Sequence, residues 1–239
     1  MKRFVLLFFA LAGFISSAAG QEQEITGFVY VSETPTPVPF ASVWVCDPAT
    51  GEPEYGTITA MNGWYDFGNV ATDQTYQLKI SGPGIRTRSK EIEIKYVPGR
   101  IGNIDYYIPV ERSADTVAFR PVETYRPKQI APDARTIEDL YSHIPGITYE
   151  DGYLTDENGA TVCLMFSGII PDEAGYAAIL TNLTADNIER IEYYRLDNLE
   201  EPYYDGVLNF VTVGVNFNAP SIKEQPVSYT HLRAHETKA

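Results

Sequence analysis

Short segments that alternate apolar and polar residues follow one another at regular intervals between residues 25 and 110, with turn-forming residues between them. A period of two is the pattern of a half-buried strand, because successive side chains point to opposite faces of a sheet. The segments are 25–31, 40–46, 56–60, 64–67, 76–80, 89–96 and 101–110. About seven short strands of this kind predict an immunoglobulin-like β-sandwich over residues 21–110.

Turn signals in the same region support this prediction. Asn62-Gly63 is a dipeptide typical of a tight turn between two strands. Pro35, Pro37 and Pro39 lie in the first connection, where a missing N–H donor does no harm, so we expect a loop there. Residues 25–29, 39–45, 61–67 and 76–80 together resemble the carboxypeptidase-regulatory-like domain. That resemblance implies a non-catalytic β-sandwich, and the family name implies no peptidase activity.

Residues 136–213 predict a small α+β domain. Thr136 and Asp139 have the spacing of a capping box at the start of a helix, and Pro145-Gly146 ends it. Between these signals, apolar residues recur at the spacing of one helix face: Ile137, Leu140, Tyr141 and Ile144. A second helix is expected over 172–183, and strands over 147–149, 161–166, 188–194 and 207–213.

This second unit resembles the plug domain of TonB-dependent receptors. The matching residues 139–147, 162–168, 183–192 and 206–212 occur in the order and spacing of that family. The resemblance implies a domain that fills the lumen of an outer-membrane barrel and moves when the inner-membrane protein TonB pulls. Two departures are the segment 166–168, where Asp-Gly is more usual, and the short, tyrosine-rich segment 193–205. A sandwich followed by a plug resembles the SusC-like subgroup, which imports glycans or peptides with a surface lipoprotein partner.

Residues 111–135 lack sustained periodicity and contain three prolines, so we expect a linker. Within it, a short β-prone segment has the character of a strand that adds to the edge of a partner's sheet. This segment consists of Asp115, Thr116, Val117, Ala118 and Phe119. The resemblance implies a TonB-contacting segment between sandwich and plug, and these five residues match it by position. An ordinary extended linker is the alternative interpretation.

Both ends of the chain carry segments that we exclude from the fold. Residues 1–20 have a basic start, an apolar run and a small-residue end, which predicts a secretory signal peptide; a membrane anchor is the alternative. Residues 214–226 are expected to begin a region that is missing here. Residues 227–239 look like a translated adapter or vector read-through, with a native disordered terminus as the alternative.

Charge and residue types exclude several function classes. The net charge of −14 argues against sequence-independent nucleic-acid binding, which needs a basic surface. Cys46 and Cys163 lie in apolar runs and are expected to be buried; a bridge between them is left open. His143 is expected to be a helix-end residue. The acidic turn 151–158 lacks the ligand spacing of an EF-hand loop.

The remaining polar and aromatic pairs are expected to play structural roles. The carboxylate pairs Glu189/Glu192 and Glu200/Glu201 are interpreted as solvated surface charge. The doublets Tyr106-Tyr107, Tyr193-Tyr194 and Tyr203-Tyr204 are interpreted as packing on sheet faces and edges rather than as sugar-stacking groups. The sequence therefore predicts no catalytic residue, no metal site and no cofactor.

The sequence favours a non-enzymatic N-terminal region of a TonB-dependent outer-membrane transporter for glycan or peptide uptake. TonB would be the energy-coupling partner, and a surface lipoprotein a second partner. The chain would be exported, and it would contact the membrane only through a missing barrel that its plug gates. The alternative is a barrel-less periplasmic module for binding or signalling.

Overall fold

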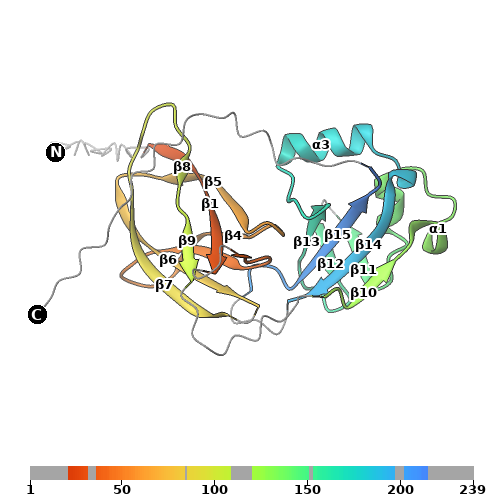
Figure 1. Cartoon of the computed structure of the whole chain (residues 1–239), viewed down its shortest axis with the longest axis horizontal. Helices are drawn as coiled ribbons and strands as arrows, with labels where there is room; N and C mark the ends of the chain where they lie inside the picture. Colours follow the sequence, from red (N-terminus) through yellow and green to blue (C-terminus); the bar gives the residue numbers. More distant parts are fainter. Residues whose placement is uncertain are drawn as a thin grey trace, which may run out of the picture.

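The computed structural model describes residues 21–31, 36–83, 85–108, 120–150, 153–196 and 202–214, which form two units lying side by side (Figure 1). The expected signal peptide, the segment Asp115 to Phe119 and the tail 227–239 lie outside the described residues. Within the described residues, no helix is long and apolar enough to cross a membrane.

The first unit contains a five-stranded sheet built on β1 (Glu22–Val31). This strand pairs antiparallel with β2 (Thr36–Pro37) and β5 (Trp64–Ala71). It pairs parallel with β8 (Gly102–Asn103) and β9 (Tyr106–Ile108). One strand thus connects the beginning of the unit to its end.

A four-stranded antiparallel sheet packs against the first, with the order β4-β3-β6-β7. Its strands are β3 (Ser42–Cys46), β4 (Pro53–Ile58), β6 (Gln74–Gly82) and β7 (Ile85–Ile94). Every second residue enters the shared core, as Val43 and Val45 of β3 and Leu78 and Ile80 of β6 illustrate. The predicted β-sandwich is therefore confirmed, and the two faces follow from the alternation in the sequence.

The described part of the sandwich contains nine strands instead of about seven. The first connection, expected to be a loop, contains β2, in which Pro37 lies opposite Tyr30 of β1. One strand was expected over 101–110, whereas the described residues 101–108 contain two short strands, because Asp105 interrupts the ladder. Its carboxylate accepts the Phe28 N–H at 3.1 Å, so this donor bonds to a side chain instead of the neighbouring strand.

The second unit is a mixed four-stranded sheet with helices, in the order β10-β14-β15-β13. The strands are β10 (Glu123–Tyr125), β13 (Val162–Phe166), β14 (Ile188–Arg195) and β15 (Gly206–Thr212). A hairpin of β11 (Ile147–Glu150) and β12 (Tyr153–Asp156) lies beside it. The helices are α1 (Pro127–Ile130), α2 (Ile137–Tyr141), α3 (Glu173–Asn182) and the 3-10 turn η1 (Ala185–Asn187).

Local signals correctly predicted the start of α2 and the whole of α3, but α2 ends at Tyr141, before the expected stop at Pro145-Gly146. Thr136 Oγ1 accepts the Asp139 N–H at 3.1 Å, and the Asp139 carboxylate accepts the Thr136 N–H at 2.9 Å, which completes a capping box at α2. Asp172 caps α3 by accepting the Gly175 N–H at 2.6 Å. Ile137, Leu140 and Tyr141 of α2 are buried in the core of the second unit, as their spacing predicted.

The expected linker 111–135 requires a correction in its C-terminal half. β10 pairs antiparallel with β14, and the Val122 N–H donates to the Tyr193 carbonyl at 2.8 Å, so residues from about 122 onward belong to the second unit. A strand of three residues and a helix of four are too short to produce a recognisable period. The sequence pattern therefore placed the start of this unit too late.

A substitution at Gly63 tests how much the stability of the sandwich depends on the predicted turn. Its φ is +81°, and a Cβ built there would approach the Val29 carbonyl oxygen to 2.7 Å. We expect Gly63→Ala to lower the free energy of unfolding by about 2 kcal/mol, because strained backbone and a steric clash combine. Urea unfolding followed by circular dichroism measures the change.

The matched control is Gly51→Ala, where φ is +75° but no atom lies within 4 Å of the added Cβ. This variant carries the backbone strain without the clash, so its loss should be about 1 kcal/mol. Equal losses in the two variants would contradict a role for close packing at Gly63.

Candidate functional site

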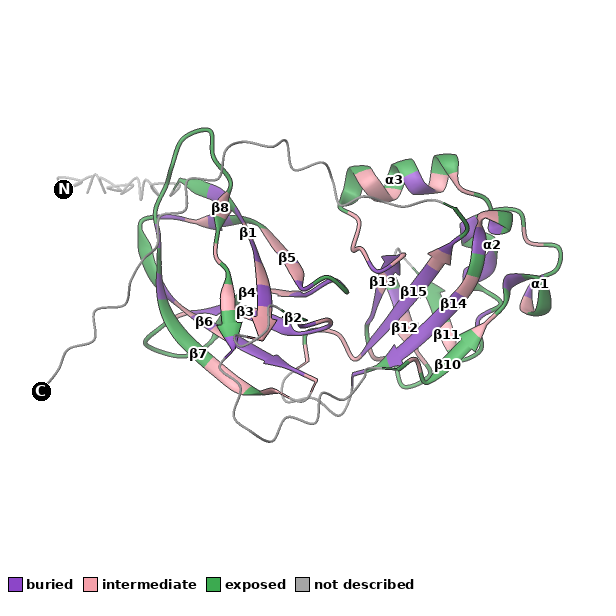
Figure 2. Ribbon diagram, viewed as in Figure 1, coloured by how far each residue is buried: buried purple, intermediate pink, exposed green. Residues whose placement is uncertain are grey.

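The two units meet across a buried apolar cluster. Phe40 and Ile58 of the sandwich pack there with side chains of β13, β14 and β15 and their flanking residues. Those side chains are Cys163, Met165, Tyr194, Leu196 and Val207. The rings of Phe40 and Tyr194 have centroids 4.9 Å apart. Figure 2 shows the buried positions extending along β14 and β15. We call this contact the junction.

Tyr203, which precedes β15, lies on the outer face of the sandwich. The Tyr203 N–H donates to Ser42 Oγ at 2.9 Å, and its ring meets that of Trp44 edge-on, with centroids 5.0 Å apart. Gly56 leaves room for this pair, because a Cβ at that position would lie 2.5 Å from the Trp44 ring and 2.6 Å from Tyr203. The departure from the plug pattern noted in the sequence thus forms part of the junction.

A turn of the sandwich also contacts the second unit. The Met61 N–H donates to the Gly168 carbonyl at 2.9 Å. Gly168 has φ +82° and follows Ser167 at φ +48°, while Phe40 on the sandwich side has φ +59°. Left-handed backbone is uncommon for Ser and Phe and persists only where surrounding contacts hold it. Both surfaces of the junction are therefore shaped by strained backbone.

A buried polar network lies beneath this turn, on the face of the second sheet that meets the sandwich. Glu192 Oε1 accepts the Arg190 Nε–H at 2.8 Å, and Glu192 Oε2 accepts from the Tyr194 hydroxyl at 2.9 Å. Asn209 Nδ2 donates to the same Oε2 at 3.0 Å, and Asn209 Oδ1 accepts the Gly168 N–H at 2.8 Å. The Asn209 amide also lies 3.8 Å from the Met61 sulfur. The network thus connects two strands, the Gly168 turn and the sandwich.

The network stabilises Glu192 in its ionised form. Burial by itself would raise the pKa of this carboxyl, but the hydrogen bonds from Arg190, Tyr194 and Asn209 outweigh burial and lower the pKa. Burial and the hydrogen bond to Glu192 both raise the pKa of the Tyr194 phenol. At neutral pH the carboxylate therefore accepts hydrogen bonds and the phenol donates one.

The expectation that Glu189 and Glu192 are both solvated surface charges was wrong for Glu192. Glu189 is exposed, whereas Glu192 is only 8% exposed. Arg190, two residues before Glu192 on the same strand face, could have indicated a paired carboxylate. Glu200 and Glu201 lie outside the described residues. The tyrosine doublets pack on sheet faces as expected. Tyr193 and Tyr194 are buried, and Tyr107, although exposed, stacks on Tyr30 with ring centroids 5.7 Å apart.

The other candidate groups have structural partners. His143 Nδ1 lies 2.8 Å from the Asp139 carbonyl and 3.1 Å from Ser142 Oγ. An Nδ1–H that donates to the carbonyl cannot also accept the Ser142 proton, so this pair lacks the arrangement of a base and a nucleophile. The Asp139 carboxylate is engaged in the capping box of α2. Among the described residues, no group of His, Cys, Asp and Glu could hold a metal ion.

Cys46 and Cys163 are buried and are not joined by a disulfide. Burial raises the pKa of the Cys163 thiol to about 12, so this group stays a protonated, poorly reactive thiol. The bridge that the sequence left open is absent, and Cys163 acts as an apolar residue of the junction.

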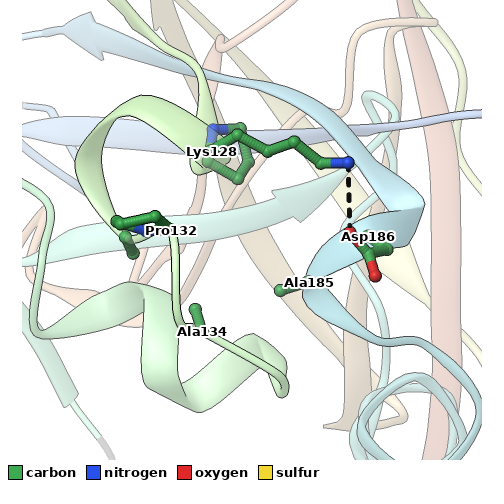
Figure 3. Close-up of a pocket in the computed structure, with 7 residues that line it drawn as sticks. Lys128, Pro132, Ala134, Ala185 and Asp186 are labelled. Carbon is green, nitrogen blue, oxygen red and sulfur yellow. Dashed lines mark ion pairs between the residues drawn. The ribbon is translucent and has the colours of Figure 1, made fainter.

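An open depression of about 280 Å³ lies between α1 and η1 of the second unit. Figure 3 shows Lys128 and Asp186 facing one another there, with Nζ and Oδ1 3.4 Å apart. The remaining lining residues are Pro127, Ala131, Pro132, Ala134 and Ala185. The depression is lined by proline and alanine residues and contains one exposed ion pair. Such a pair would contribute little to the binding of a ligand. We therefore place the candidate site at the junction.

Residues 24–104 match the family model of the carboxypeptidase regulatory-like domain. The match covers most of the sandwich and confirms the first resemblance. A comparison with curated proteins found no match to the chain.

Glu192 gives the junction a testable dependence on pH. Because its pKa is lowered in the folded protein, its stabilising contribution is complete above the ordinary value of 4.5 and is lost as pH falls through the folded value. We expect Glu192→Gln to destabilise the protein by about 1–3 kcal/mol at neutral pH, and the difference to shrink in acid. Urea unfolding at a series of pH values measures both effects.

Glu189→Gln is the control, because it removes an exposed carboxylate that contacts the same Arg190. This variant should be as stable as the unaltered chain at neutral pH, and its stability should fall in acid to the same extent. The assignment would fail if the Glu192 variant lost stability in acid as steeply as the unaltered protein.

Proposed function

We propose that this chain is the exported, non-enzymatic N-terminal region of a TonB-dependent outer-membrane transporter for glycans or peptides. The sandwich would precede a plug domain that gates a transmembrane barrel. The proposal rests on the second unit, where three of the segments that resemble the plug family become neighbouring strands. They are β13, β14 and β15, and β15 pairs with both of the others.

The contacts inside this sheet couple the β13 turn to its neighbouring strand and to the sandwich. The Gly168 turn after β13 is bound to Asn209 of β15, which in turn bonds to Glu192 of β14. Met61 connects the same turn to the sandwich. A movement of the β13 turn would therefore have to break hydrogen bonds to β15 and to the sandwich together. Force applied to the second unit would therefore also act on the sandwich.

The proposed transporter needs no covalent step. Its partners would be TonB, which supplies force from the inner membrane, and a surface lipoprotein that cooperates with the barrel. We assign TonB contact to the segment Asp115, Thr116, Val117, Ala118 and Phe119, which lies outside the described residues. Its position before β10 would place it at the start of the proposed plug. The alternative remains a periplasmic binding or signalling module without a barrel.

The assignment of this segment predicts binding in solution. A peptide of residues 109–125 should bind the C-terminal domain of TonB saturably in a calorimetric titration, because an extended β-prone segment can add a strand to a sheet edge. The matched control is the same peptide with Val117→Pro, which removes a backbone donor and should bind much more weakly. Equal binding of the two peptides, or binding of neither, would remove the site assignment.

The genomic DNA after the codon for Pro226 tests the transporter itself. Several hundred further codons encoding alternating strands would support the proposal, because each strand that crosses a membrane alternates lipid-facing and interior residues. A stop codon soon after that position would contradict the proposal and favour the barrel-less module. This result is independent of which residues contact TonB.

A further inference from the structure

The loop between β7 and β8 gathers apolar side chains on the surface at one end of the sandwich. It spans residues 95–101 and appears in Figure 1 as the yellow-green loop that extends beyond the strands. Tyr96, Val97 and Ile101 are exposed, and they are three of the ten large hydrophobic side chains exposed on the described part of the chain. Exposed apolar residues grouped in this way mark an interaction site more often than scattered ones do.

Gln23 holds the backbone of this loop from inside the sandwich. Its side chain is only 5% exposed. Gln23 Oε1 accepts the Val97 N–H at 2.7 Å, while its Nε2 donates to the Arg100 carbonyl at 2.7 Å. The Arg100 N–H also donates to the Val97 carbonyl at 3.2 Å. One buried amide thus fixes both ends of the turn, and the Val97 side chain is exposed although its backbone is held.

The loop itself is basic, although the whole protein is acidic. Residues 95–101 carry two basic side chains and no acidic one in a chain of net charge −14, while Glu93 and Asp73 lie where the loop leaves β7. Lys90, Lys95 and Arg100 are exposed. Lys95 pairs with Glu93 at 3.1 Å, but both side chains are more than half exposed, so this pair costs little to break. The apolar residues therefore lie beside cations.

We propose that the 95–101 loop inserts into the interface of a phospholipid bilayer that contains anionic lipid. Val97 and Ile101 would enter the boundary between head groups and acyl chains, and Tyr96 would lie at head-group level with its hydroxyl in water. Lys95 and Arg100 would extend their aliphatic stems along the apolar surface and reach lipid phosphates. This surface is distinct from the junction and does not depend on the proposed transport function.

The shape of the loop favours a bilayer over a folded protein partner. Its apolar residues project from the end of a turn that is held from inside, whereas a peptide-binding site would require a groove or an open strand edge. A fluid interface needs no complementary pocket, and its negative surface matches the local cations of an otherwise acidic protein. The loop is also already ordered by Gln23, so insertion would cost little conformational entropy.

Vesicle binding tests the proposal directly. The chain from Gln21 onward is used, because the apolar run of residues 4–15 would partition into lipid by itself. We expect this chain to co-sediment with vesicles of phosphatidylethanolamine and phosphatidylglycerol, more weakly with phosphatidylcholine, and less at high salt. The double variant Val97→Ser/Ile101→Ser should bind about tenfold more weakly, because it removes the inserted apolar groups. Arg100→Gln should lower binding about fivefold.

Val122→Ser is the matched control, because Val122 and Ile101 are each 57% exposed and lie in different units. It should bind as the unaltered chain does. A Val97→Trp variant places a fluorescent side chain in the loop. If the loop inserts, lipids brominated near the head of the acyl chain should quench the fluorescence of this tryptophan. Thermal unfolding of each variant checks that the fold is retained.

Three results would overturn the proposal. One is vesicle binding that survives Val97→Ser/Ile101→Ser unchanged, and another is the absence of vesicle binding by the unaltered chain. The third is capture of a soluble acidic peptide by the loop without any binding to vesicles, which would identify a protein partner instead. Loss of binding in the double variant but not in Val122→Ser supports the proposal.

Discussion

The Glu192 carboxylate lies inside the protein, and much of the second unit is arranged to make that possible. A buried charge is tolerated only when hydrogen bonds replace the water it has lost. Arg190 and Tyr194 supply two of these from the same strand, and Asn209 supplies the third from β15. Glu192 faces Asn209 directly in the antiparallel register. A slip of one residue would turn the carboxylate into the apolar core on the other face of the sheet.

The same network fixes how the sandwich and the second unit meet. Asn209 can bond to Gly168 only because the backbone at Ser167 and Gly168 turns into the left-handed region. That turn leaves the Gly168 carbonyl free to accept from Met61 of the sandwich. On the other side, Phe40 adopts an unusual backbone angle and places its ring against Tyr194. The residues with left-handed backbone on the two surfaces thus also contact the other unit, Gly168 through Met61 and Phe40 through Tyr194.

Features set by neighbours in the chain were predictable from the sequence. The capping box at Thr136, the turn at Gly63 and the alternating strands of the sandwich each depend on a few consecutive residues, and the structure contains all of them. Features that depend on distant partners were missed. β10 is a strand only because β14 offers a free edge, and Asp105 divides a strand only because the Phe28 N–H lies within its reach. Neither leaves a periodic pattern in the sequence.

By itself, the sequence determined the two units, most strands of the sandwich and the starts of the two longer helices, because alternation, helix spacing and turn chemistry are local properties. Only the tertiary structure decided which of the many carboxylates is buried and why. Glu192 resembles its exposed neighbour Glu189 until strand pairing brings Asn209 opposite to it and the sandwich covers it. The tyrosines at 203 and 204 likewise gained their role from a distant surface. Burial results from contacts between residues far apart in the chain, and a linear pattern cannot reveal which of them will meet.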